Sequence, residues 1–488
     1  MRDYSFGNFL RELRTRRGLS QFQLGMLVGV SDKAVSKWEN GSAKPQSRIL
    51  YGLSEVLGIT VDELLACKYH SGGFAMTKAL WTKASQALTD LYGDVPPMEA
   101  VNRYFTEYEE LKSTDQITYF DFLGRLARLS VCGKGHIQVQ GGIGASFIAF
   151  IMGASEINPL SPHYHCPCCH SFLPVDAPLC GWDLPAKKCS CGREMIRDGH
   201  KIPFEILRPL LRKTAHYDIS VSGNLYQAAE ETIFSYFREN KVVILTKEES
   251  GIRTYVILDA KYPDLKNGQA LPLREYYDRL KGYPAITLVW NEELDAWRKL
   301  EEETGTEFEK VPFLDQRVFD AFLGGDTQGI PEFRTEFART MIEECAPATI
   351  HDLLQIPGLC HGTGVWERNG QALVRTGRPV GTLIAYRDDV FHYVQEKVRS
   401  QNGSGTGFAC HVAENTRRGV YARDGIPQED RQQFLTLGAE EWFIESLEKI
   451  RYLFPKAHAI PYVKHALTLM WYKVYHPESF RKIILNGK

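Results

Sequence analysis

The apolar positions of the first 65 residues follow helical spacing. A first helix carries its apolar face on Phe6, Phe9, Leu10 and Leu13. Gly18 ends that helix, and Ser20 and Ser31 are suited to cap the next two helices, with Gly29 at the tight turn between them. The closing helices take their apolar residues from Leu50, Leu53, Val56, Leu57, Leu64 and Leu65. The pattern predicts an all-α domain of five helices over residues 1–66.

The third of these helices, at about residues 31–39, has two chemically different sides. Its core side carries Ala34, Val35 and Trp38, and its outer side carries Lys33, Ser36 and Lys37. A helix with short polar and cationic side chains on its outer side can enter the major groove of DNA. The residues expected to face DNA are Gln21, Lys33, Ser36, Lys37 and Asn40. The alternative is a helical bundle that contacts only protein.

The run LSQFQLGMLVGVSDKAVSKWENG resembles the Xre/Cro/C1-type helix-turn-helix family, with its serine caps, turn glycine and Ser-Lys-Trp-Glu-Asn-Gly ending in the family's register. The resemblance covers about Phe6 to Leu65 and implies sequence-specific binding to double-stranded DNA. Residues 1–65 hold nine basic and seven acidic residues. This small positive charge implies modest affinity for DNA, and therefore a homodimer or a second DNA contact.

Residues 67–132 are predicted to form a helical connector. Two amphipathic stretches are separated by the break at Pro96-Pro97. The first stretch presents Leu80, Ala84, Leu88 and Leu91, and the second presents Tyr119, Phe122, Leu126 and Leu129. The residue pattern of this segment indicates no chemistry.

Six of the eleven cysteines lie between Cys166 and Cys191, which is typical of a metal site and not of a disulfide scaffold. The proposed ligands are Cys166 and Cys169 in a Cys-x2-Cys hook, and Cys189 and Cys191 in a tighter second hook. Four thiolates suit tetrahedral Zn²⁺, and a site closed by four protein ligands stabilises a fold without catalysing. The short second hook leaves Cys168, Cys180 or a histidine as alternative ligands, and free thiols as the alternative to a metal site.

From about Gly133 onward, a series of runs resembles the PolC-type alpha subunit of bacterial DNA polymerase III. These runs include GGIGASF, ASEINPLSPHYHCPCC, GWDLPAKKC, DISVSGNLYQ, LLQIPGLCHGTGVW and KIRYLFPKAHAIPYV. The resemblance implies a truncated mixed α/β palm over residues 133–290, a zinc knuckle at 166–191 and α-helical fingers over 291–488. The fold class expected for the whole chain is therefore multidomain, with α and α+β parts.

The resemblance also implies where catalytic groups would stand. The family carries Asp-x-Asp before a Ser-Gly pair and a third aspartate on a later strand, which together hold two Mg²⁺ ions. In this chain His216 takes the first of these positions, Asp218 the second and Thr287 the third. Gln140 stands where the family has a phosphate-binding arginine. We therefore expect no catalytic residues beyond a residual Asp218.

Two alternatives concern residues elsewhere in this region. Asp259 follows a β-rich run and could pair with Asp218 in a rearranged Mg²⁺ site, which would make the protein an active nucleotidyltransferase. The fingers keep basic residues that could hold primer-template or single-stranded DNA: Arg387, Arg417, Arg418, Arg451, Lys456 and His458. The ordinary interpretation of these cations is a solvated basic face.

Composition narrows the class of protein. The formal net charge is −2, so any affinity for DNA must come from local patches. No apolar run is long enough for a membrane span, and residues 1–10 lack the order of a signal peptide, so we expect a cytoplasmic, nucleoid-associated bacterial protein. The favoured function is a DNA-binding regulator or replication-associated factor with an inactive polymerase remnant. An active polymerase and an interaction module that mimics the replicative polymerase are the alternatives.

Overall fold

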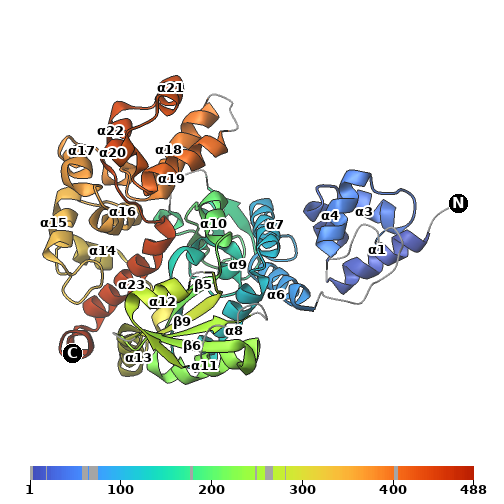
Figure 1. The fold of residues 1–488 in the computed structure, drawn as a ribbon, viewed down its shortest axis with the longest axis horizontal. Coiled ribbons are helices and arrows are strands. Elements are labelled where there is room, and N and C mark those ends of the chain that lie inside the picture. The colour runs from blue at the N-terminus through green and yellow to red at the C-terminus, as the bar shows by residue number, and fades with distance from the viewer. Residues whose placement is uncertain are drawn as a thin grey trace.

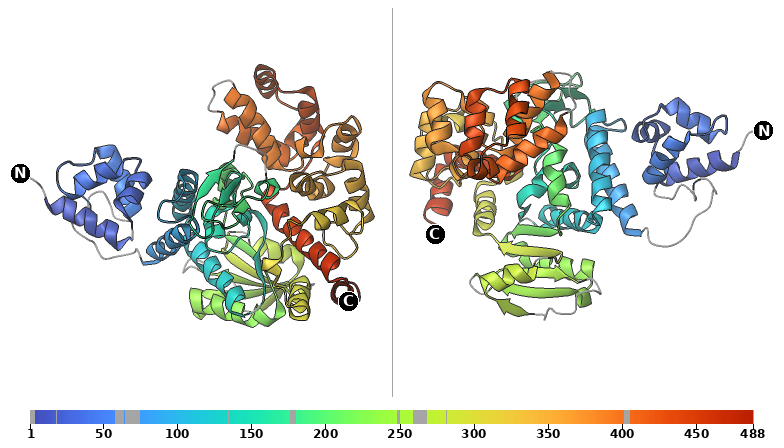
Figure 2. Two further views of the ribbon diagram at one scale, coloured as in Figure 1. Left: turned by 180° about the vertical axis from the view of Figure 1, so that it is seen from behind. Right: turned by 45° about the horizontal axis from the view of Figure 1, so that its top comes forward.

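Three groups of elements follow one another along the chain and across the molecule: N-terminal helices, a central sheet with its covering helices, and C-terminal helices (Figures 1 and 2). The computed structural model describes residues 4–17, 19–57, 64, 75–133, 135–175, 180–247, 250–258, 268–280, 282–400 and 405–487. The arrangement confirms a multidomain chain with α and α+β parts.

The N-terminal group contains α1 (Tyr4–Arg16), α2 (Gln21–Leu27), α3 (Asp32–Glu39) and α4 (Ser47–Leu57). The Ser20 hydroxyl accepts from Gln23 N at 3.1 Å, and Ser31 Oγ accepts from Ala34 N at 3.3 Å, so both serines cap helices as the sequence predicts. Gly29 has φ +73° at the turn between α2 and α3. Gly18 and Leu65 lie outside the described residues, as does most of the predicted fifth helix, of which Leu64 is described and buried.

Three helices form the connector: α6 (Ala75–Tyr92), α7 (Met98–Ser113) and α8 (Ile117–Gly133). The sequence pattern gives the apolar faces of α6 and α8 but misses α7. The reason is that α7 buries two tyrosines and two glutamates along with its apolar residues: Ala100, Val101, Tyr104, Glu107, Tyr108, Glu110 and Leu111. Glu107 is satisfied inside by Ser146 and by the backbone N–H groups of Phe147 and Ile148.

A six-stranded mixed sheet with strand order β1-β5-β9-β7-β6-β8 forms the centre. Its strands are β1 (Ile137–Val139), β5 (His216–Val221), β6 (Val242–Lys247), β7 (Arg253–Ile257), β8 (Gln269–Leu271) and β9 (Ala285–Trp290). One face packs on α8 and α11 (Gly223–Phe237), where Tyr217 and Phe237 both contact the Tyr119 ring. The short elements around the sheet are η1 (Gly141–Ala145), α9 (Phe147–Ile151), α10 (Phe204–Leu211), η3 (Glu239–Lys241) and α12 (Leu273–Leu280).

A small three-stranded sheet, in the order β3-β2-β4, lies between α9 and α10 in sequence. It consists of β2 (His163–His165), β3 (Phe172–Pro174) and β4 (Ile196–Asp198), with η2 (Gly181–Asp183) in the connection. Among the described residues, its own core consists of Tyr164, Cys166, Leu184, Cys189 and Met195, so apolar burial there contributes little to its stability.

The C-terminal group is helical, and its long helix α23 (Lys456–Tyr475) returns to the central body and packs on η1 (Figure 1). The preceding helices are α13 (Glu292–Thr304), η4 (Phe308–Lys310), α14 (Gln316–Leu323), α15 (Glu336–Cys345), α16 (Ile350–His361), η5 (Trp366–Gly370), α17 (Gln371–Arg375), η6 (Val380–Thr382), α18 (Arg387–Ser400), α19 (Thr406–Arg417), α20 (Val420–Asp424), α21 (Gln428–Leu437) and α22 (Glu441–Lys449). The chain ends with α24 (Pro477–Phe480) and η7 (Arg481–Leu485). No described helix is both long and apolar enough to cross a bilayer.

Candidate nucleic-acid interfaces and metal centre

Helix α3 presents two cations on its outer side. Lys33 and Lys37 are exposed, one turn apart, and Ser36 beside them is half-buried. Val35 and Trp38 are buried on the opposite side, which fixes the rotation of the helix about its axis. Asn40 is exposed at the C-cap, where its side-chain oxygen accepts from Ser42 N at 3.0 Å. Four of the five residues expected to face DNA therefore lie along one helix.

Gln21, the fifth of that set, uses its side chain inside the domain. Its amide donates to Glu39 Oε2 at 2.8 Å, and Arg14 Nε donates to Glu39 Oε1 at 2.5 Å. Burial by itself would raise the pKa of Glu39, but the bonds from Arg14 and Gln21 lower it below its usual value. Gln21 thus stabilises a buried carboxylate that joins α1, α2 and α3.

The four cysteines proposed as metal ligands come together at one end of the small sheet. Cys166 Sγ lies 3.5 Å from Cys191 Sγ, and Cys169 Sγ lies 3.4 Å from Cys189 Sγ. All four sulfurs are within 4.8 Å of one another. Zn–S bonds of about 2.3 Å in a tetrahedron require sulfur–sulfur separations of about 3.8 Å, so the cluster has the dimensions of a four-thiolate metal site.

At two of the four cysteines, backbone N–H groups favour the thiolate form that binds metal. The N–H of Cys191 is the main cause that lowers the pKa of the Cys189 thiol to about 6, and the N–H groups of Cys169 and Cys168 lower the pKa of Cys166. The alternative ligands lie elsewhere: Cys180 is buried with its sulfur 3.7 Å from His200 Nδ1, and Cys168 is exposed outside the cluster. Although only one residue separates Cys189 from Cys191, the cluster contains both predicted cysteine pairs and, among the described residues, none of the alternative ligands.

The central sheet places Asp218 in a cross-strand row with uncharged neighbours. On β9, Thr287 is the direct partner of Asp218, and on β7, Thr254 is the direct partner of Thr287. The two threonine hydroxyls are 3.0 Å apart, and Thr254 also bonds to the Tyr276 hydroxyl from α12. Neighbouring strands lie about 4.8 Å apart, so groups at these positions could share a metal ion, but threonine brings no charge.

Gln140 borders Asp218 on the β1 side. Its backbone N–H donates to Asp218 O at 2.8 Å, and its amide donates to Ser220 Oγ at 2.6 Å. His216, two residues before Asp218, is exposed and donates to Tyr283 O at 2.6 Å. Among the described residues, Asp218 belongs to no group of three or more His, Cys, Asp or Glu side chains close enough to share an ion. Asp259, the alternative partner, lies outside the described residues.

Two of the basic residues expected to contact DNA through the fingers are buried. Arg387 is 5% exposed and donates to Ile206 O at 2.7 Å, which joins α18 to α10. Lys456 is 3% exposed at the start of α23, where its backbone N–H donates to Asp388 Oδ2. Neither side chain can reach a phosphate in this structure, because both are buried in the fold.

The other members of the fingers set lie closer to the surface. Arg418 and Arg451 are exposed, and Arg417 pairs with Glu414 at 2.6 and 2.8 Å. Gly419, with φ +64°, brings these segments together, because a Cβ there would stand 2.4 Å from Arg451 O. His458 stacks on Phe454, with 5.5 Å between ring centroids, and burial lowers its pKa.

One polar cluster escapes prediction from the sequence because its members are far apart along the chain. His136, just before β1, contacts Glu309 Oε1 through Nδ1 at 3.1 Å and Glu301 Oε2 through Nε2 at 3.2 Å. Burial by itself would lower the pKa of His136, but the two glutamates raise it to about 9. The cluster joins the sheet to α13 and η4.

Comparisons with known proteins agree with this architecture. Residues 10–64 match the helix-turn-helix family model, and residues 293–441 match the model of the bacterial DNA polymerase III alpha subunit finger domain. The chain thus carries one segment similar to helix-turn-helix domains and another similar to the finger domain of the bacterial DNA polymerase III alpha subunit. The resemblances predicted from the sequence are therefore confirmed.

The similarity to PolC extends beyond the fingers. The "DNA polymerase III PolC-type" of Caldanaerobacter subterraneus subsp. tengcongensis is 29% identical over 467 residues, which covers 80% of this chain and 32% of that protein. The protein of the same description from Streptococcus mutans is 30% identical over 417 residues, covering 69% of this chain and 28% of that protein. The chain thus spans about a third of the length of these relatives. Below, "PolC-like region" means residues 133–488.

Proposed function

We propose that this protein binds double-stranded DNA through α2 and α3, and that its PolC-like region holds DNA or a protein partner without extending primers. Such a protein would act as a regulator or as a replication-associated factor on the bacterial nucleoid. The observation that carries the second half of the proposal is the row Gln140, Asp218, Thr287 and Thr254, which offers one carboxylate for a reaction that needs a cluster of them.

The DNA-binding half rests on the exposed lysines of α3. Lys33 and Lys37 stand one turn apart beside Ser36, on the side of the helix away from the buried Trp38. Lysines at this position can contact phosphates on the edges of a groove while shorter side chains meet base edges. The small net charge of the domain favours two domains acting together, and we therefore include a homodimer in the proposal.

Duplex binding is tested by replacing both lysines. We expect K33M/K37M to weaken binding to duplex DNA about tenfold or more at 0.1 M salt and to reduce the slope of log K against log salt by about 2. The matched control is K299M/K310M, which removes two exposed lysines from α13 and η4 and should leave both quantities unchanged. Equal affinity in wild type and K33M/K37M would contradict the proposed interface.

Loss of chemistry is tested with a primed template, all four deoxynucleotides and Mg²⁺. The two metal ions stabilise the reacting phosphate, and a cluster of carboxylates is needed to hold them, so a row with one carboxylate should give no measurable extension. Incorporation that disappears in Asp218→Ala would overturn this half of the proposal and would favour an active polymerase with rearranged carboxylates.

The metal in the cysteine cluster is proposed to be Zn²⁺. The four thiolates of Cys166, Cys169, Cys189 and Cys191 match its preferred ligand type and separations, and they leave no coordination position for a substrate. When bound, zinc would supply no step of a reaction. It would hold together a small sheet whose core, among the described residues, consists of five buried residues.

A further inference from the structure

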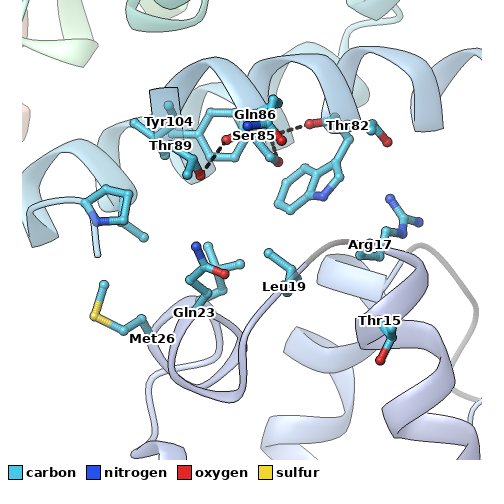
Figure 3. Close-up of a pocket in the computed structure, with 15 residues that line it drawn as sticks. Thr15, Arg17, Leu19, Gln23, Met26, Thr82, Ser85, Gln86, Thr89 and Tyr104 are labelled. Atoms are coloured by element: carbon cyan, nitrogen blue, oxygen red, sulfur yellow. Dashed lines mark hydrogen bonds between the residues drawn. The ribbon is translucent and has the colours of Figure 1, made fainter. Parts of the chain in front are cut away.

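A cavity of about 260 Å³ lies between the helix-turn-helix domain and the connector. Figure 3 shows Ser85 and Thr89 of α6 on one side of it, and Leu19, Gln23 and Met26 of the helix-turn-helix domain on the other. Gln23 also donates to Asp94 O at 2.9 Å, so α2, which supports the DNA-facing helix, is hydrogen-bonded to the loop after α6. The cavity therefore separates two parts of the chain whose relative orientation decides where α3 points.

The walls of the cavity combine an apolar surface with a single charge. Its apolar lining comes from Leu19, Met26, Leu27, Trp81, Leu88 and Val101. Arg17 stands at the edge, where one guanidinium nitrogen donates to Leu57 O at 2.7 Å. None of the lining residues is acidic. An anion would therefore meet the Arg17 charge there and no carboxylate among the described residues that line the cavity.

Trp81 adds an observation that points to a ligand. Its ring is 1% exposed and forms part of the wall, yet its indole N–H has no hydrogen-bond partner among the described residues. Buried N–H donors in proteins are nearly always paired, so an unpaired donor at a cavity wall calls for an acceptor. A bound carboxylate or carbonyl oxygen is such an acceptor.

The size of the cavity limits the ligand. A dry apolar cavity of about 150 Å³ holds benzene, so about 260 Å³ suits a molecule of roughly ten non-hydrogen atoms. We propose that this cavity binds a small aromatic carboxylate, with its ring among Leu19, Trp81 and Leu88 and its carboxylate toward Arg17. Because the ligand would contact both α2 and α6, it would favour one orientation of the helix-turn-helix domain and thereby change its affinity for DNA.

Binding is tested first without DNA, on the full chain, by calorimetry with phenylacetate and its neutral analogue phenylacetamide. We expect saturable binding of one phenylacetate per chain. Arg17→Met should weaken phenylacetate about tenfold without weakening phenylacetamide, and the control Arg128→Met, at an exposed cation on α8, should change neither. Thr89→Phe should fill the cavity and abolish binding of both, whereas Thr89→Ala should retain it.

Three results would overturn the site: no saturable binding of phenylacetate to the wild type, unchanged binding in a folded Thr89→Phe variant, or equal loss in Arg17→Met and Arg128→Met. The link to DNA rests on the proposed function and has its own readout. Saturating phenylacetate should change duplex affinity at least threefold in the wild type and not in Thr89→Phe. Binding of phenylacetate without that change would overturn the coupling but not the site, and a protein that binds phenylacetate but no DNA would contradict the proposed function instead.

Discussion

The cysteine knuckle and the Asp218 row lie in the same PolC-like region but differ in how many possible metal ligands they bring together. The knuckle has all four sulfurs within 4.8 Å of one another, whereas the row has one carboxylate between a glutamine and two threonines. Removing a thiolate from a metal site removes the free energy that folds the knuckle. Removing carboxylates from a cluster relieves like-charge repulsion and costs the fold nothing. Sets of ligands that hold a fold and sets that perform a reaction can therefore vary independently of each other.

The largest effect is expected at the knuckle. The double variant C166S/C169S should lose the metal and unfold residues 163–198, because structural zinc contributes on the order of 10 kcal/mol to the folding of small domains. Hydrogen exchange of those residues should become fast, and metal analysis should fall from one Zn²⁺ per chain to none. Lower pH should release the metal, since protons compete for the thiolates.

The matched control for the knuckle is Cys168→Ser, which removes a neighbouring exposed thiol that stands outside the cluster. This variant should keep its zinc and its exchange protection. Zinc loss in Cys168→Ser, or a stable metal-free knuckle in C166S/C169S, would remove the distinction between the two regions.

Adding carboxylates to the Asp218 row tests whether charge is what the row needs in order to bind a metal ion. H216D/T287D places three carboxylates on adjacent positions of β5 and β9, and we expect a Mg²⁺ site with Kd on the order of 1 mM, equivalent to about 4 kcal/mol. Calorimetry with MgCl₂ should show no such binding in the wild type. The matched control H216N/T287N keeps the shape of the two aspartates without their charge, so binding of Mg²⁺ by this control as tight as by H216D/T287D would contradict a charge-based account.

The sequence predicts the parts of this molecule whose signals are local. Ser20, Ser31 and Gly29 act on neighbouring backbone, and each has the role that its residue type predicts. The cysteine ligands are recognisable from their spacing. In contrast, Arg387 and Lys456 are of charged residue types that are normally exposed. Only the packing of α18 and α23 shows that both are buried.

Helix α7 and the His136 cluster were out of reach of sequence patterns for a related reason. The buried face of α7 includes Glu107 and Glu110, whose partners include residues far along the chain. His136 meets Glu301 and Glu309 across more than 160 positions. In a sequence, a charged residue that is buried with a partner cannot be distinguished from one on the surface. Buried polar contacts can therefore be identified only once the fold is known.

A smaller effect, of about 3 kcal/mol, is expected at His136, which joins the sheet to the C-terminal helices. Its pKa of about 9 exceeds the unfolded value of 6.5, so its contribution is complete below about pH 6.5 and is lost as pH rises through 9. The urea concentration at the midpoint of unfolding should therefore decrease as the pH is raised from 6.5 to 9.5. The fluorescence of the neighbouring Trp297 can be used to follow unfolding. His136→Gln should be less stable at pH 6.5 and should lose this pH dependence. A wild-type midpoint that stays constant over the range would contradict the pairing.

The smallest effects are expected at the helix caps, which belong with the knuckle among the groups that hold the fold. Ser20 takes part in a reciprocal pair, since its hydroxyl accepts from Gln23 N at 3.1 Å and its N–H donates to the Gln23 side chain at 2.7 Å, whereas Ser31 makes one longer bond of 3.3 Å. Ser20→Ala should destabilise the helix-turn-helix domain by about 1 kcal/mol, and Ser31→Ala by less. Hydrogen exchange of α2 and α3 measures both. Because neither hydroxyl is proposed to contact DNA, duplex affinity at low temperature should stay within twofold of wild type in both variants. A larger loss of affinity in Ser31→Ala than in Ser20→Ala would place Ser31 in the DNA interface. The same residue would then both cap a helix and contact DNA, whereas the knuckle and the Asp218 row separate structural from functional groups.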